Sequence, residues 1–421
     1  MARFLYSLLF HLLLPLVLMR LLWRGLRAPA YRHRWRERFG VGVAHQQGGL
    51  WVHAVSVGET LAAAPLVAAW QQAHPGEPVF LSTMTPTGSA RVRAIWGDSV
   101  GHAYAPYDLP WAWALFLRRV RPVALVIMET ELWPNMIAAV HARGIPVLLA
   151  NARLSERSAR GYARAGWLAR PMLAQLTQIA AQDEATADRF RALGVAPARV
   201  TVTGSLKFDF SAPADLPARA EVLRHKWALD NRPVLVAAST HEGEDESLLT
   251  ALSQLRETFP SLLLVLVPRH PERFEAVARQ ITDAGFALVR RSTDEPVSAG
   301  TAVFLGDSMG ELLLWYALAD VAFVGGSLRP PLGGHNMLEP IALGVPTLSG
   351  PHVTNFQAIA DELVAAGALQ LVPADAIADT VRVVLTDNAL REQQMAAGER
   401  VLVRNRGALA RQMALLEAMQ T

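Results

Sequence analysis

The sequence of 421 residues contains no cysteine and only two lysines, Lys207 and Lys226, among its 40 basic residues. Without cysteine the chain forms no disulfide and no thiolate metal site, which fits a reducing compartment. The 40 basic and 37 acidic residues nearly cancel, so the charge balance gives no reason to expect a nucleic-acid partner. Because arginine is the usual cation here, Lys207 reflects either chance or a need for a compact point charge.

Several sequence motifs of nucleotide chemistry are also missing. The chain has neither a Walker A motif nor the G-x-G-x-x-G pattern of dinucleotide-binding folds. It has no D-x-D triplet, so a sugar-nucleotide site built on a carboxylate-held metal has no support. We therefore predict a function that needs no metal and no cofactor.

The chain does contain a long apolar stretch near its N-terminus. Residues 4–23, FLYSLLFHLLLPLVLMRLLW, approach the ~20 residues that span a bilayer. Arginines follow the stretch at Arg20 and Arg24, which favours a retained anchor over a cleaved signal and places the bulk of the protein in the cytoplasm. We predict a single membrane anchor over residues 1–30.

The next segment, YRHRWRERFG at residues 31–40, alternates arginines with aromatic and other residues. Cations mixed with aromatics are typical of a surface that contacts anionic lipid. A solvated linker helix would have the same composition, so the sequence leaves both interpretations open.

From Gly49 onward, short apolar runs alternate with helix-like segments. LWVHAVS, PVFLST, HAYAP, VALVIME, PVLLANA, LTQIAAQ and VTVTG are strand candidates in the first half, and PVLVAAS, LLLVLVP, FALVRR, AVFLG, VAFVGG, VPTLSG and LQLVP are candidates in the second. This alternation predicts βαβ units and parallel sheets. The polar segment KFDFSAPADL, which contains a proline, reads as a linker. We therefore predict two Rossmann-like domains, residues 31–210 and 211–421, with a ligand cleft between them.

Residues 324–346, VGGSLRPPLGGHNMLEPIALGVP, form a glycine-rich loop between a strand-like run and a helix-like run. A helix start offers free backbone N–H groups that suit a phosphate, and glycines let a ligand approach the backbone. Asn336 and Glu339 are three residues apart, so both can face one side of the first turn and bind sugar hydroxyls. The alternative is a capped helix after a surface loop.

Three carboxylates follow strand candidates in the first half. Glu59, in HAVSVGET, could act as a general base, or it could be a first-turn glutamate favoured by the helix dipole. Glu129 and Glu131 follow VALVIM. We expect the chain to turn after Glu129, which would then lie at the strand end, and the alternative is a pair of solvated loop carboxylates.

Two further strand ends in the second half could bind an anion. Arg269 follows LLLVLVP and suits a phosphate, although a surface arginine would look the same. The segment GDSMGE at residues 306–311 opens a helix and could accept an anion. It also fits the hydrolase pattern G-x-S-x-G with Ser308 as nucleophile, for which His335 or His352 would have to supply the histidine.

In its ordered motifs the chain resembles the 3-deoxy-D-manno-oct-2-ulosonic acid (Kdo) transferases. The motifs are HAVSVGE, METELWPN, NARLSERS, GSLKFD, STHEGE, VPRHPER, GDSMGEL and GGHNMLEP, and the resemblance runs from the anchor to about Phe356. It implies the α/β fold of GT-B type, with two Rossmann-like domains. It also implies an inverting transfer of Kdo from CMP-Kdo to the lipid A precursor (lipid IVA) in lipopolysaccharide core biosynthesis, without a bound metal.

The resemblance also assigns roles to residues. Glu59 matches the general base, and Glu129 and Lys207 match positions that stabilise the transition state. The nucleotide positions are Pro268, Arg269, Met309, Gly310, Glu311, Asn336, Met337, Leu338 and Glu339. The expected partners are CMP-Kdo, the lipid A precursor and a membrane surface, and the expected location is the cytoplasmic face of the inner membrane. The alternatives are an inactive, membrane-tethered GT-B binding protein and a GT-B transferase that uses a UDP-sugar.

Overall fold

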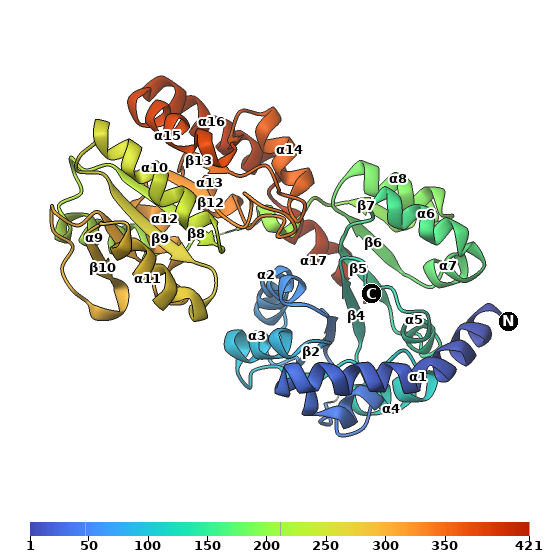
Figure 1. The fold of residues 1–421 in the computed structure, drawn as a ribbon. Coiled ribbons are helices and arrows are strands. Elements are labelled where there is room, and N and C mark those ends of the chain that lie inside the picture. Colours follow the sequence, from blue (N-terminus) through green and yellow to red (C-terminus); the bar gives the residue numbers. More distant parts are fainter. Residues whose placement is uncertain (47, 211, 421) are drawn as a thin grey trace. The chain divides into compact units, whose positions relative to one another are not determined.

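The computed structural model describes residues 1–46, 48–210 and 212–420, which form two compact units (Figure 1). Unit 1 comprises Met1–Asp209 together with the chain from Asn405 onward, and unit 2 comprises Phe210–Arg404. The predicted limits of the domains therefore need two corrections. The N-terminal apolar segment is part of unit 1 rather than separate from it, and the chain beyond Asn405 leaves the C-terminal domain and returns to unit 1.

Unit 1 is built on a parallel sheet of seven strands in the order β3-β2-β1-β4-β5-β6-β7. The strands are β1 Leu50–His53, β2 Val79–Thr83, β3 Gly101–Tyr104, β4 Ala124–Met128, β5 Val147–Ala152, β6 Gln178–Ala181 and β7 Val200–Val202. The central strands are buried along their whole length, as expected for a parallel sheet with helices on both faces. Each strand falls on an apolar run singled out in the sequence.

Helices cover both faces of this sheet. They are α1 Ala2–Arg27, α2 Val57–Ala73, α3 Pro86–Trp96, α4 Pro110–Val120, α5 Pro134–His141, α6 Glu156–Arg164, α7 Gly166–Leu173, α8 Glu184–Ala192 and α17 Ala408–Ala418, with 3-10 turns η1 Pro29–Arg32, η2 Trp35–Phe39, η3 Pro197–Arg199 and η4 Leu206–Phe208. Three of these helices, α3 to α5, have proline in the first turn, where its missing N–H costs nothing.

Unit 2 has a second parallel sheet, in the order β10-β11-β9-β8-β12-β13-β14. Its strands are β8 Val234–Thr240, β9 Leu263–Pro268, β10 Leu288–Arg290, β11 Val303–Leu305, β12 Val321–Val324, β13 Thr347–Ser349 and β14 Leu369–Leu371. Its helices are α9 Leu216–Lys226, α10 Glu244–Thr258, α11 Phe274–Asp283, α12 Leu312–Leu318, α13 Leu338–Ala342, α14 Gln357–Ala365, α15 Ile377–Thr386 and α16 Asn388–Asn405, with 3-10 turns η5 Pro271–Arg273, η6 Arg291–Thr293 and η7 Ala374–Ala376.

Each sheet has a switch point, where successive crossovers run in opposite directions from the central strand. In unit 1 it lies between β1 and β4, and in unit 2 between β8 and β12. Ligands of open α/β sheets bind outside the carboxyl ends of the strands at such a point. Glu59 and Glu129 follow the two strands of the first switch point, and the STHEGE and glycine-loop motifs follow those of the second.

The C-terminal helix α17 completes unit 1. Its buried face, which includes Met413 and Leu416, belongs to the apolar cluster that packs on one face of the first sheet. The Asp209 carboxylate accepts the Gly407 N–H at 2.6 Å, and the Asn151 N–H donates to Gln412 Oε1 at 3.1 Å. The chain is thus tied to unit 1 at both places where it passes between the units.

The arginine-rich segment after α1 is neither a solvated linker helix nor exposed throughout. Arg34 donates to Glu37 Oε1 at 2.7 Å and to Ser89 Oγ at 2.8 Å. Arg38 is 2% exposed, and its guanidinium lies over the Tyr104 ring. Two of the four arginines therefore fix this segment to unit 1, while Arg32 and Arg36 remain exposed.

Candidate active site

Glu59 lies in the first turn of α2, directly beyond β1. Ser56 is the N-cap, and its Oγ accepts the Glu59 N–H, while Glu59 Oε1 accepts from the Ser56 hydroxyl at 3.1 Å. Glu59 Oε2 accepts the Val55 N–H at 2.7 Å. This is a capping box, so the first-turn alternative from the sequence is structurally correct. The capping role does not exclude a role as a base, because burial and two nearby carboxylates change the pKa of Glu59.

Burial raises the pKa of Glu59 to about 7, and repulsion from Glu131 and, more weakly, Glu129 adds to this effect. The hydrogen bond from Val55 opposes the rise without cancelling it. A carboxyl group with a pKa near 7 can accept a proton at neutral pH and is a better base than an ordinary glutamate. Perturbed carboxylates at a strand end are typical of functional sites.

The chain leaves β4 at Glu129, whose backbone adopts a left-handed conformation with φ of 55°. This is the turn expected from the sequence, and it separates the directions of Glu129 and Glu131. The Glu131 carboxylate accepts from Trp133 Nε1 at 3.0 Å. Burial raises the pKa of Glu131, and Glu129 adds repulsion. The two side chains are therefore not a pair of solvated loop carboxylates.

Lys207 belongs to the short turn η4. Burial lowers the pKa of Lys207, whereas attraction to Glu129 raises it and repulsion from Arg153 lowers it. Arg153 also lies 3.8 Å from the Glu129 carboxylate. Unit 1 thus brings Glu59, Glu129 and Lys207 into one electrostatic cluster. Sequence reasoning named Glu131 only as a neighbour of Glu129 and did not single out Arg153, although Arg153 lies in the NARLSERS motif.

The turn that carries Lys207 is positioned by a buried amide. Asn151 is fully buried and has a φ of 50°, and its Oδ1 accepts the Leu206 N–H at 3.1 Å. The Asn151 carbonyl accepts from Gln182 at 2.8 Å. Because Asn151 is bonded on three sides, it fixes the backbone next to Lys207.

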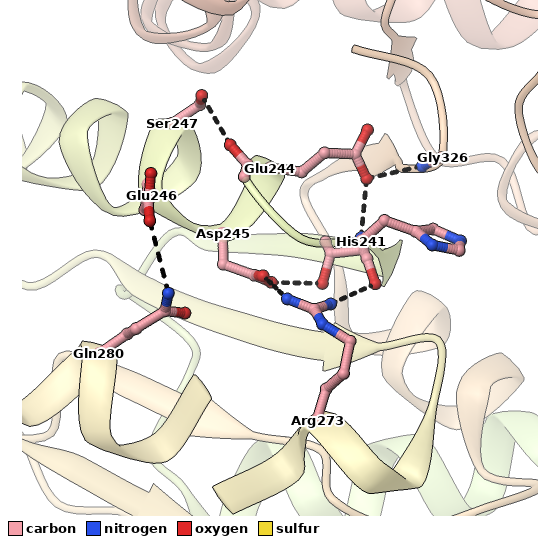
Figure 2. A network of polar contacts seen from close by, with 10 residues as sticks. His241, Glu244, Asp245, Glu246, Ser247, Arg273, Gln280 and Gly326 are labelled. Carbon is pink, nitrogen blue, oxygen red and sulfur yellow. Dashed lines mark hydrogen bonds and ion pairs between the residues drawn. The ribbon is translucent and has the colours of Figure 1, made fainter. Parts of the chain in front are cut away.

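At the second switch point a carboxylate holds two loops together (Figure 2). Glu244 is 1% exposed and accepts four backbone N–H groups: from His241 at 2.9 Å, Gly326 at 2.7 Å, Ser327 at 2.8 Å and Leu328 at 2.9 Å. These last three amides belong to the glycine loop. They donate inside the protein, so the first part of this loop does not offer these N–H groups to a ligand.

Asp245, the next residue, ties the loop after β8 to the loop after β9. It is fully buried and accepts from Thr240 Oγ1 at 2.6 Å and from the Arg273 guanidinium. Arg273 also donates to the Thr240 carbonyl at 2.9 Å (Figure 2). Hydrogen bonds therefore connect the three loops of this switch point. The two carboxylates that connect them are Glu244, the last residue of the STHEGE motif, and Asp245, the residue after it.

The second part of the glycine loop differs from the first. Asn336 Nδ2 donates to Glu339 Oε1 at 3.0 Å, so these two side chains do face each other. Helix α13 starts at Leu338 and has only five residues. The side chains of Met337 and Leu338 are fully buried, so a ligand could contact only their backbone groups, and the Leu338 N–H already donates to Asn336 Oδ1 at 3.2 Å. Burial raises the pKa of Glu339, opposed by the bond from Asn336.

Beside this loop lies a histidine pair. His241 Nε2 and His335 Nε2 are 2.9 Å apart, and the rings are stacked. Burial lowers the pKa of His335 to about 4, and His241, Arg269 and His270 lower it further. The half-buried Arg269 follows the buried Pro268 at the end of β9, and its N–H donates to the Thr240 carbonyl at 3.0 Å.

The segment at residues 306–311 precedes α12. Met309 is 63% exposed, and Gly310 has a φ of 88°. The Arg291 guanidinium donates twice to the Glu311 carboxylate, at 3.0 and 3.1 Å, and the Ser308 hydroxyl also donates to Glu311. Ser308 is thus bonded to a carboxylate while His335 faces another histidine, an arrangement unlike that of a hydrolase elbow.

Comparison with known protein families and sequences identifies relatives of this chain. The family model for 3-deoxy-D-manno-octulosonic-acid transferases matches residues 33–210. A 3-deoxy-D-manno-octulosonic acid transferase of Haemophilus influenzae is 44% identical, with 99% of this chain and 98% of that protein covered. One of Bordetella pertussis is 39% identical, with 99% of each chain covered.

One solved structure shares the fold of most of the chain. The UDP-GlcNAc 2-epimerase of Neisseria meningitidis is 14% identical, with 85% of this chain and 99% of that chain covered, and its TM-score is 0.55. The C-terminal CMP-Kdo binding domain of WaaA from Acinetobacter baumannii is 41% identical, with 45% of this chain and 99% of that chain covered, and its TM-score is 0.44. With two parallel seven-stranded sheets, the fold is of the GT-B type predicted from the motifs. The relatives of known name are similar along nearly the entire chain, and the protein belongs to the 3-deoxy-D-manno-octulosonic acid (Kdo) transferases, a family of glycosyltransferases.

Proposed function

We propose that this protein moves Kdo from CMP-Kdo to the lipid A precursor (lipid IVA), with inversion at the anomeric carbon, in lipopolysaccharide biosynthesis. The carboxylate cluster at the first switch point supports this proposal most directly. Glu59 is a buried group with a pKa of about 7, beside Glu129 and Lys207. An inverting transfer needs such a base on the acceptor side.

In this reaction an acceptor hydroxyl oxygen forms a bond to the anomeric carbon of Kdo. The bond from that carbon to the CMP phosphate oxygen breaks, and the hydroxyl proton passes to Glu59. Glu59 must be deprotonated to accept it, which is the dominant state above pH 7. Negative charge develops on the departing phosphate, and a cationic group close to it stabilises the transition state. We assign this charge stabilisation to Lys207, and Glu129 supports it because its attraction favours the charged form of Lys207.

We propose that unit 2 binds the nucleotide. Arg269 supplies a cation for the phosphate, and the Asn336 and Glu339 pair binds ribose hydroxyls. The exposed segment at residues 309–311 contacts the base through its backbone, and Pro268 and the backbone at Met337 and Leu338 complete the site. The fixed loops around Glu244 hold these groups in place before the nucleotide binds, which reduces the cost of binding.

The test is a transfer assay with the full-length protein, CMP-Kdo and the lipid A precursor, analysed by mass spectrometry of the lipid. We expect lipid that is heavier by one or more Kdo units. A lipid of unchanged mass, with the protein folded, would contradict the proposal. Competition between CMP and UDP for binding then tests the donor, because stronger binding of UDP would indicate a UDP-sugar.

We also propose that the protein works at the cytoplasmic face of the inner membrane. Helix α1 contains the stretch Ala2–Leu26, with a mean hydropathy of 2.0, which is long and apolar enough to cross a membrane. A lipid acceptor explains why a transferase would need such a helix. Arg20 and Arg24, near its C-terminal end, favour the cytoplasm for the bulk of the chain.

A further inference from the structure

Helix α1 has one face that packs on unit 1 along almost its whole length. Ser7, Phe10, Leu14, Val17 and Leu21 recur at intervals of three and four residues, the spacing of one helical stripe, and all five are buried or half-buried. The helix packs against α5 and α7. Its other faces are apolar and open.

Two side chains of α1 fasten its N-terminal half to a buried polar cluster. Ser7 Oγ donates to Asn135 Oδ1 at 2.9 Å, and the Tyr6 hydroxyl lies near the Asp108 carboxylate. Asp108 is 4% exposed and also accepts the Asn135 N–H at 3.0 Å. Detaching α1 would remove the donor from the buried Asn135 Oδ1, which is unfavourable.

Apolar packing continues the contact toward the other end of the helix. Phe10, Leu14, Val17 and Leu18 pack against a small cluster formed by Tyr107, Leu109 and Ala112. Further on, Gly25 lies so close to Arg32 that an added Cβ would come within 2.9 Å of its side chain. The helix is therefore attached to unit 1 from Tyr6 to Gly25.

This attachment conflicts with a spanning helix. A spanning helix is surrounded by hydrocarbon over about 30 Å, so every part of unit 1 that packs along α1 would also have to enter the hydrocarbon. That part includes loops and the Asp108 carboxylate. Lipid-exposed loops do not occur in the hydrocarbon core, and charged groups there are costly.

We propose that α1 lies in the plane of the membrane surface, with one face docked on unit 1 and the opposite face immersed in the lipid leaflet. The proposal rests on the proposed membrane association but not on Kdo transfer. The immersed face includes Phe4, Leu12, Leu16, Leu22 and Leu26, whose side chains are 55–70% exposed. Such a continuous apolar face on a helix that already has a protein partner requires a second apolar partner.

Charge complementarity favours lipid as that partner. Arg20 and Arg24 are exposed near the C-terminal end of the helix, and Arg32 and Arg36 are exposed in the turns that follow. Trp23 is 53% exposed. Arginines and tryptophan at the border of an apolar helix face are typical of helices that bind an anionic membrane surface in its plane.

The sidedness of the two helix ends tests the proposal, and the absence of native cysteine makes single-cysteine labelling unambiguous. Three full-length variants, Ala2→Cys, Ala30→Cys and Ser253→Cys, are placed in sealed inverted membrane vesicles with a membrane-impermeant maleimide. Ala30 is exposed in the turn η1, directly after the C-terminal end of the helix. Ser253 is exposed in unit 2 and reports the cytoplasmic side. We expect all three to label without detergent. Labelling of Ala2→Cys only after the vesicles are opened would overturn the proposal, as would release of the protein from washed vesicles.

A crosslink tests whether the docked face stays docked in the membrane. In the variant Ser7→Cys/Asn135→Cys, oxidation of intact vesicles is expected to form an intramolecular disulfide, because these side chains are in contact. The matched control is Leu12→Cys/Asn135→Cys, in which the first cysteine lies on an exposed face. Failure of the first pair to crosslink in membranes, when it does so in detergent, would show that α1 leaves unit 1 to enter the bilayer. Neither readout depends on transfer, so the outcome is independent of the proposed function.

Discussion

The two switch points use the same residue type in opposite ways. Each has a buried glutamate in the first turn of the helix that follows the central strand, Glu59 after β1 and Glu244 after β8. Glu59 accepts one backbone N–H from another residue and lies near two more carboxylates, whereas Glu244 accepts four N–H groups from two loops. The number of donors and the neighbouring charges thus distinguish a glutamate with a raised pKa, which we propose to be the base, from one that holds two loops together.

The largest expected effect comes from neutralising the first glutamate. Glu59→Gln keeps the size of the side chain but cannot accept the proton, so we expect kcat to fall by about 10²–10⁴-fold. CMP binding should persist, since the nucleotide positions are in unit 2. The assay is mass spectrometry of the lipid product, with Glu77→Gln as a control on an exposed carboxylate of unit 1. Wild-type transfer by Glu59→Gln would remove the proposed base.

The matching change in unit 2 should act on stability and binding. Glu244→Gln places an amide where four N–H groups require acceptors, and a buried group without a partner costs about 1–3 kcal/mol. We expect a lower unfolding midpoint and weaker CMP binding, measured by denaturant titration and calorimetry. Glu246→Gln, on the exposed side of the same helical turn, is the control and should change neither. If Glu244→Gln kept its stability but lost only the chemical step, the contrast between the two glutamates would fail.

A smaller effect is expected on the pH dependence of the reaction, which tests why the pKa of Glu59 is raised. Glu59 has a raised pKa of about 7 and acts when deprotonated, so kcat/KM should rise as pH increases through 7 and then level off. Glu131→Gln removes the second-largest cause of this shift, so the rise should move to lower pH. The measurement is a pH–rate profile of both proteins, with the exposed Glu156→Gln as control. An unchanged midpoint in Glu131→Gln would mean that Glu131 does not contribute to the raised pKa of Glu59.

The smallest expected effect concerns the segment before α12. Ser308 donates to Glu311 and has no role in the proposed reaction. We expect Ser308→Ala to transfer Kdo within about twofold of the wild-type rate, because only one partly buried hydrogen bond is lost. Loss of all activity in this variant would revive the nucleophile interpretation of the G-x-S-x-G pattern.

The sequence predicts the strands and their parallel arrangement because a buried parallel strand is an uninterrupted apolar run. It does not predict strand order, since the same runs would fit a sheet without β11 between β9 and β10. It also does not predict which polar side chains turn inward. Arg34 and Arg38 look like the exposed Arg32 and Arg36 until their partners are known.

The candidate site, too, is only partly predictable from the sequence. Motifs indicate Glu59, Glu129 and Lys207, and their strand-end positions explain why they can act together. The roles of Glu244 and Asn151 depend on hydrogen bonds between segments more than fifty residues apart, to Gly326 and Leu206 respectively, which no local pattern reveals. The catalytic assignments and the nucleotide positions stay predictions until the variants are measured.

Because α17 returns to unit 1, the order in which the chain is synthesised affects the folding of unit 1. As the chain leaves the ribosome, the strands of unit 1 emerge first, but the helix that covers Asn151 and caps at Asp209 is made only after all of unit 2. The apolar surface of unit 1 that α17 buries therefore stays exposed until unit 2 has been translated. Stop codons shortly before Ala408 should spare unit 2 and damage unit 1, even though most of unit 1 is encoded far upstream.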